Sequence, residues 1–182
     1  LCGGCVPVFG GVVLSMERMN AVVEIDPADL LARLEAGLSL RDFYAALAAE
    51  RLFFPPHPGE EGATVGGVVA TNAGGSRAVK YGTVRNFVRG LDVVFPDGSA
   101  ASLGGKVLKD SSGYSLMHLM IGSEGTLGVV TAATLSVMPA PSSTLTLIVP
   151  FDAAAAAFGT ASDILRAGIV PLAVEFVPRR VI

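Results

Sequence analysis

Several features that mark common functional classes are missing from this sequence of 182 residues. It has no cluster of lysine and arginine, and its small net charge of −3 is spread along the chain, which argues against nucleic-acid binding. No uninterrupted apolar run reaches the roughly 18 residues that a membrane-spanning helix needs. No basic segment followed by an apolar stretch opens the chain, so no secretory signal is indicated. These absences predict a cytoplasmic protein and leave peripheral membrane contact open.

Residues suited to metal binding or thiol chemistry are also scarce. Cys2 and Cys5 are the two cysteines of the chain, and a strand-like segment follows them where a redox pair would open a helix. A structural zinc site needs a second pair of ligands, which the sequence does not offer. The two histidines, His57 and His118, are isolated. We therefore interpret both cysteines as loop residues and expect structural or packing roles for the histidines.

What the chain does have is a stretch of small residues at 55–75. It contains six glycines, three prolines, two threonines and one asparagine. Small residues such as Gly66, Gly67 and Gly74 leave backbone N–H groups unshielded, and such groups bind anions when they point together. We predict that this stretch cradles a phosphate-bearing cofactor, with plain tight turns as the alternative.

A second glycine-rich turn follows at 122–128. Neither stretch has the spacing of a P-loop, and neither has the spacing of a Rossmann dinucleotide site. A cofactor with a pyrophosphate, a ribose and a flat ring could still span both. The side chains offered for hydrogen bonds are Thr64, Thr71, Asn72 and Ser123, and the bare backbone lies at Gly66, Gly67, Gly74, Gly75 and Gly125.

Hydrophobic periodicity and turn residues predict the order of the secondary structure. Strands are predicted at 12–15, 22–25, 31–36, 88–95, 100–103 and 129–138, with a hairpin turn at 96–99. Ser39 is predicted to cap a helix with an apolar stripe over 40–48, and 114–121 to form one or two helical turns. After a stiff connector at Pro139 and Pro141, we predict a strand at 145–149, a helix at 153–166 capped by Asp152 and Gly168, and a strand at 170–177. This last unit is interpreted as the first half of a split β-α-β domain.

Two long segments carry a resemblance to a known family. The segments ATVGGVVATNAGGSRAVKYGTVRNFVRGLDVVFPDG and GGKVLKDSSGYSLMHLMIGSEGTLGVVTAATLSVMP closely resemble FAD-linked oxidases of the vanillyl-alcohol oxidase type, in the branch of the glycolate oxidase flavin subunit and D-lactate dehydrogenase. The resemblance implies an α+β fold, with a two-sub-domain FAD-binding domain of the PCMH type over 1–141. It also implies that 142–182 begin a ferredoxin-like α+β substrate-cap domain. Because the chain opens inside a glycine-rich loop, we expect it to be a piece of a longer protein.

The same resemblance implies FAD as the cofactor and a set of residues that line it. The set is Gly3, Gly4, Pro56, Pro58, Gly59, Ala63, Thr64, Gly66, Gly67, Thr71, Asn72, Gly74, Tyr81, Gly82, Glu124, Gly125, Gly128 and Val129. His57 stands where the family has an aspartate between two prolines, so any role of that acidic side chain is left unfilled. The nearby cations Arg77, Lys80 and Arg85 could meet a phosphate or a substrate carboxylate. For each one singly we expect a solvated loop residue.

The family's chemistry is hydride removal from the α-carbon of a small 2-hydroxy acid, of the D-lactate or glycolate type, to flavin N5. Its catalytic and metal-binding histidines are expected beyond Ile182, so we assign no catalytic residue and no metal ligand. The implied partners are the hydroxy acid and an electron acceptor, which could be an iron-sulfur subunit, an electron-transfer flavoprotein or a quinone; homo-oligomers stay open. Three alternatives remain: a flavin-binding module that is inactive alone, a sugar, aldonolactone or enolpyruvyl oxidoreductase of the same fold, and a scaffold without flavin.

Overall fold

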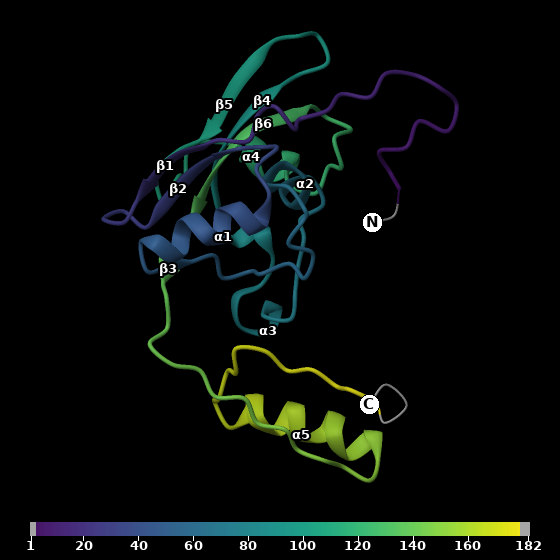
Figure 1. Ribbon diagram of the computed structural model, residues 1–182, viewed down its shortest axis with the longest axis vertical. Helices are drawn as coiled ribbons and strands as arrows, with labels where there is room; N and C mark the ends of the chain where they lie inside the picture. The colour runs from purple at the N-terminus through teal and green to yellow at the C-terminus, as the bar shows by residue number, and fades with distance from the viewer. Residues whose placement is uncertain (1–2, 179–182) are drawn as a thin grey trace.

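A five-stranded antiparallel sheet forms the centre of the computed structural model, which describes residues 3–178 (Figure 1). The strands are β1 (Val22–Asp26), β2 (Leu31–Glu35), β4 (Val88–Val94), β5 (Ala100–Gly104) and β6 (Val129–Ser136). Their spatial order is β1-β2-β6-β4-β5. The last of these strands in the chain therefore lies between two hairpins that precede it.

Short helices and a second small sheet complete this part of the molecule. They are α1 (Leu40–Ala49), α2 (Val65–Ala70), α3 (Ala78–Tyr81), the 3₁₀ helix η1 (Val84–Phe87) and α4 (Leu116–Met120). The two-stranded sheet pairs β3 (Leu52–Phe53) with β7 (Met138–Pro139). This mixture of helices and antiparallel strands is the predicted α+β class.

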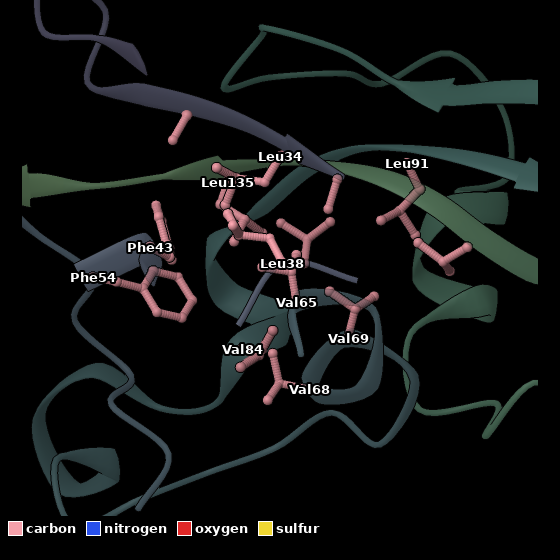
Figure 2. Packing of buried hydrophobic residues seen from close by; sticks show 14 of the residues in the cluster. Leu34, Leu38, Phe43, Phe54, Val65, Val68, Val69, Val84, Leu91 and Leu135 are labelled. Carbon is pink, nitrogen blue, oxygen red and sulfur yellow. The ribbon is translucent and has the colours of Figure 1, made fainter. Parts of the chain in front are cut away.

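The hydrophobic core lies between the five-stranded sheet and the helices α1 and α2. Leu34 of β2 and Leu135 of β6 point toward Phe43 of α1 and Val65 of α2, and all four side chains are fully buried (Figure 2). Burying a side chain of this size contributes about 1.5–3 kcal/mol relative to leaving it exposed. The core thereby fixes the position of α2, which lies inside the glycine-rich stretch.

Local sequence signals account for most elements of this part. Ser39 caps α1, because its hydroxyl oxygen accepts a hydrogen bond from the Asp42 N–H at 3.1 Å, as predicted. The hairpin of β4 and β5 turns at 96–99, with Gly98 at a φ of +83°. The predicted long strand at 129–138 is divided: β6 ends at Ser136, and Met138 and Pro139 belong to β7. The strand predicted at 12–15 is wrong; those residues are exposed and make no ladder.

The segment after Pro141 contains one helix and no strand among the described residues. The helix α5 (Ala154–Arg166) was predicted, and its C-terminal cap at Gly168 is confirmed: the Gly168 N–H donates to the Leu165 carbonyl and the Ile169 N–H to the Ile164 carbonyl. Asp152 does not cap it, since Ala153 holds the N-cap position. The strands predicted at 145–149 and 170–177 are wrong. Both segments run extended beside α5 without forming a ladder (Figure 1).

Candidate functional site

The glycine-rich stretch at 55–75 contains the helix α2, which the sequence did not reveal. Thr64 is its N-cap, and its Oγ1 accepts a hydrogen bond from the Gly67 N–H at 3.2 Å. Val65, Val68 and Val69 are buried and hold one face of the helix against the core (Figure 2). Packing therefore forms a helix from residues whose own helix propensity is low.

The first turn of α2 does not offer the unshielded N–H groups that the sequence suggested. The Gly66 N–H donates to the Ala36 carbonyl at 2.7 Å, and the Gly67 N–H is taken by the Thr64 side chain. A Cβ on Gly66 would lie 2.8 Å from the Cβ of Ala36, so close packing against the end of β2 explains this glycine. The prediction of bare backbone at Gly66 and Gly67 is wrong.

Bare backbone does occur at other glycines of the predicted set. Within residues 3–178, the backbone N–H groups of Gly59, Gly74 and Gly125 have no protein acceptor. A Cβ on Gly59 or on Gly125 would meet no atom within 4 Å, so both residues border open space. Gly125 also has a φ of +76°, which an L-residue rarely adopts. These positions can present N–H groups to an anion.

The second glycine-rich turn lies directly on the C-terminal end of α2. The Gly122 N–H donates to the Val69 carbonyl at 3.1 Å, and the Glu124 N–H donates to the Ala70 carbonyl at 2.9 Å. Glu124 also lies near the start of the chain, because its Oε2 is 3.9 Å from the place of a Cβ on Gly4. Three segments far apart in the sequence thus meet in one region, as the prediction of a cofactor spanning both loops requires.

The residues of the predicted set differ in exposure. Those exposed to solvent are Gly3, Gly4, Gly59, Gly67, Thr71, Gly74, Glu124 and Gly125. Those half-buried are Ala63, Thr64, Gly66, Asn72, Tyr81, Gly82 and Val129. Those buried are Pro56, Pro58 and Gly128. The exposed group is the one whose atoms a ligand can reach directly.

Packing within the protein accounts for two glycines and the tyrosine of that set without a ligand. A Cβ on Gly128 would lie 2.9 Å from Cγ1 of Val93, and one on Gly82 would lie 2.5 Å from Nδ2 of Asn86. Tyr81 packs edge-on against Phe53 and Phe87, with ring centroids 6.1 and 6.3 Å away. Contact of these residues with FAD stays a prediction.

His57 sits where the two ends of the glycine-rich stretch meet. It has a φ of +44°, and its carbonyl oxygen is 2.2 Å from the place of a Cβ on Gly75, so only glycine fits there. Its ring packs on Tyr44 of α1 with centroids 5.3 Å apart. Burial lowers the pKa of His57, and the positive charge of Arg77 lowers it further, while Glu61 opposes them.

Arg85 was expected to be a solvated loop residue. That expectation is wrong. Its Nη1 donates to the His118 carbonyl at 2.5 Å, its Nη2 donates to the Ile121 carbonyl, and its backbone N–H donates to Oδ1 of Asn72 at 3.0 Å. Arg77 lies over the ring of Phe53 at 5.8 Å and Lys80 over that of Tyr81 at 5.5 Å. A long-range contact of this kind leaves no periodic signal in the sequence.

No group of residues suited to holding a metal ion accompanies the two glycine-rich loops within residues 3–178. In that part of the chain no three of His, Cys, Asp and Glu gather where they could hold a metal ion. Nδ1 of His118 lies 2.6 Å from Oγ of Ser115, on the exposed surface of α4. A cavity of about 320 Å³ lies beside these two residues, between β5 and the segment 107–118. Cys5 is exposed and unbonded, and Cys2 lies outside the described residues.

Comparison with known proteins agrees with this arrangement of sheet and glycine-rich loops. The family model for an FAD binding domain matches residues 1–104, which is more than half of the chain. The chain belongs to this family of FAD-binding domains, found in FAD-linked oxidases of the PCMH type, and its cofactor is FAD. The family-level prediction is thus confirmed.

Relatives and a solved structure extend the match beyond residue 104. The chain is 45% identical over 182 residues to a D-lactate dehydrogenase of Anaerostipes hadrus, covering 100% of this chain and 38% of the relative. It is 46% identical over 182 residues to a D-lactate dehydrogenase of Archaeoglobus fulgidus, covering 100% of this chain and 41% of the relative. It is 42% identical over 177 residues to the glycolate oxidase subunit GlcD of Bacillus subtilis, covering 97% and 38%. The structure of an alkyldihydroxyacetonephosphate synthase superposes with a TM-score of 0.72 at 25% identity, covering 86% of this chain and 28% of that one.

The chain spans about two fifths of the length of these curated relatives. Within the described residues, no helix is both long enough and apolar enough to cross a membrane.

Proposed function

We propose that this chain is the cofactor-binding part of an FAD-dependent enzyme that oxidises a small 2-hydroxy acid, of the D-lactate or glycolate type. The observation that supports this most directly is the meeting of Gly4, the end of α2 and the turn at Glu124 in one region. Each brings exposed backbone or a small residue to the same place. The names of the relatives, D-lactate dehydrogenase and glycolate oxidase subunit, supply the substrate class.

The proposed site offers backbone N–H donors of the kind that bind phosphate oxygens. The free N–H groups of Gly59, Gly74 and Gly125 can donate to phosphate oxygens, and the open space beside Gly59 and Gly125 admits a ligand next to the main chain. Asn72, Thr71 and Glu124 can orient the rest of the cofactor. When bound, FAD accepts a hydride at flavin N5. We propose that the other predicted residues also line the FAD site, around those named above.

The domain boundary near Pro141 is also part of this proposal. Residues 1–141 would form the FAD-binding domain, and 142–182 the beginning of a substrate-cap domain. Supporting this division, the segment 140–153 has neither helix nor strand, and α5 lies apart from the sheet, joined to it by that segment (Figure 1). In a split β-α-β unit the two outer strands flank a place taken by a later strand. The segments at 145–149 and 170–177 are extended but unpaired among the described residues. We propose that a strand from a later part of the protein pairs with both and so makes them strands of one sheet.

The test uses the full-length protein that carries this chain. We expect the purified protein to show a flavin absorption spectrum that bleaches anaerobically with D-lactate or glycolate, and L-lactate serves as the matched control. A yellow protein that no 2-hydroxy acid reduces would contradict the substrate class alone. A protein that does not retain FAD would contradict the cofactor role and favour a scaffold.

A second candidate is a flavin-binding module that does no chemistry alone. It is favoured by the lack, within residues 3–178, of a group of His, Cys, Asp and Glu that could hold a metal ion. Oxidation of a hydroxy acid by the isolated 182 residues with an artificial acceptor would contradict it. The sugar and aldonolactone alternative predicts reduction by those substrates in the same assay. For the full-length protein we also propose an electron acceptor that is a protein or a quinone. We propose in addition a homo-oligomer and a cytoplasmic location with peripheral membrane contact.

A further inference from the structure

Arg85 lies at the junction of the two glycine-rich loops and bonds to both sides of it. Its backbone N–H donates to Oδ1 of Asn72 at 3.0 Å, just beyond the C-terminal end of α2. Its guanidinium donates to the carbonyls of His118 and Ile121, which precede the turn at 122–128. A single residue of η1 therefore connects two segments that are otherwise distant in the sequence.

The packing at this junction leaves little room for adjustment. Asn72 has a φ of +48°, and Gly122 has a φ of +84°. A Cβ on Gly122 would lie 3.3 Å from Cβ of Asn72 and 3.5 Å from Nη2 of Arg85. The loop at 122–128 thus rests directly on the Asn72–Arg85 pair. If the guanidinium were removed, the carbonyls of His118 and Ile121 would lose their donor, and the loop would lose a fixed support.

The bonding of Arg85 is not that of an ordinary surface ion pair. Within residues 3–178 it makes no salt bridge with a carboxylate, and both of its bonded Nη atoms meet main-chain oxygens. The planar guanidinium can serve two carbonyls at once in a fixed geometry, whereas a lysine ammonium on a flexible stem holds them less well. The residue is therefore suited to fixing a distance between loops.

We propose that Arg85 is a positioning residue for FAD: it holds the loop at 122–128 at a set distance from Asn72, and so sets the affinity and orientation of the cofactor that both loops contact. This inference rests on the proposed binding of FAD across the two loops. It assigns Arg85 no direct contact with the cofactor.

The experiment compares three variants of the full-length protein: Arg85→Gln, Arg85→Lys and the control Arg41→Gln. Arg41 is an exposed arginine of α1 whose side chain makes no hydrogen bond or ion pair within the described residues. The dissociation constant for FAD is measured at a temperature where circular dichroism shows each apoprotein fully folded. The visible circular dichroism of bound flavin is recorded alongside it.

We expect Arg85→Gln to weaken FAD binding at least tenfold and to change the flavin signal. Arg85→Lys should lie between Arg85→Gln and the wild type, and Arg41→Gln should match the wild type. If Arg85→Gln lowers only the melting temperature, with FAD affinity within twofold and an unchanged flavin signal, the inference is overturned and the role is merely structural. If Arg85→Gln does not fold, Arg85→Lys decides by the same criterion. Failure of the wild type to bind FAD would overturn the proposed function as well. Failure of the inference alone is different, because the wild type and Arg85→Gln would then bind FAD equally well.

Discussion

At the scale of single residues, His57 and Tyr44 form a pair whose ionisation is set by burial. Burial and the charge of Arg77 lower the pKa of His57 below its ordinary 6.5. Burial raises the pKa of Tyr44 to about 12, with Arg77 opposing and Glu61 reinforcing the shift. Both side chains therefore favour their neutral forms, in which the two rings pack on each other near Gly75, at the end of the glycine-rich stretch.

The lowered pKa of His57 predicts that stability falls as pH falls below 6.5. In that range the unfolded chain binds a proton on His57 before the folded chain does, so the free energy of unfolding decreases until the folded pKa is passed. The check is the urea midpoint of wild type and His57→Gln at pH values above and below 6.5. The variant should lose less stability over that interval. Equal losses in both proteins would show that carboxylates alone cause the pH dependence.

The hydroxyl of Tyr44 is buried and has no hydrogen-bond partner within the described residues. Tyr44→Phe removes this unsatisfied group and keeps the ring against His57, so we expect stability unchanged or increased by about 1 kcal/mol. In the wild type, stability should also fall as pH rises from 10 toward 12, because tyrosine ionises first in the unfolded chain. Chemical denaturation at neutral and alkaline pH measures both effects. A clear loss of stability in Tyr44→Phe at neutral pH would reveal a partner for the hydroxyl.

At the scale of elements, glycines of the cradle divide into those that pack and those that face open space, and two substitutions separate them. Gly66→Ala places a Cβ against Ala36 and should destabilise the fold by about 1–3 kcal/mol. Gly59→Ala meets no neighbour within 4 Å, so the fold should be unaffected. If Gly59 borders FAD, its substitution should weaken FAD binding while the melting temperature of the apoprotein stays constant. Unchanged affinity in Gly59→Ala would remove that residue from the proposed site.

The sequence predicted elements that have local signals and failed where long-range contacts decide. Ser39 predicted the start of α1, and Gly98 predicted the β4–β5 hairpin, because caps and tight turns depend on a few neighbouring residues. The helix α2 was missed because two glycines in six residues argue against a helix, and only the burial of its valines overrides them. The strands predicted at 12–15, 145–149 and 170–177 failed for the opposite reason: strand-forming residues need a ladder partner, and periodicity does not supply one.

For the candidate site, the sequence located both loops but misjudged which atoms are free. Of the glycines predicted to have bare backbone, Gly66 and Gly67 use their N–H groups inside the protein, while those of Gly74 and Gly125 have no acceptor within residues 3–178. The family resemblance supplied the cofactor, which spacing alone left unnamed. Arg85 was missed because its acceptors at His118 and Ile121 lie far along the chain.

At the scale of the whole molecule, the sheet and the segment after Pro141 should behave as separate units. The helix α5 does not pack extensively against any other helix or strand of the described part. We therefore expect removal of residues 142–182 to leave the main thermal transition of the FAD-binding part within a few degrees of its original position. Differential scanning calorimetry of the shortened and unshortened chains measures this. A loss of the transition would show that the C-terminal segment supports the sheet.

The strand β6 gives the molecule a timing constraint during synthesis on the ribosome. Its Ser136 pairs with Leu31 of β2 and its Val129 pairs with Val94 of β4. The two hairpins therefore cannot join into one sheet until β6 has been synthesised. Until β6 has left the exit tunnel, β2 and β4 each present an unpaired edge to other chains. A nascent chain halted at residue 104, where the family match ends, would lack the strand that joins the sheet. Chaperone demand should therefore be greatest between the synthesis of β5 and that of β6.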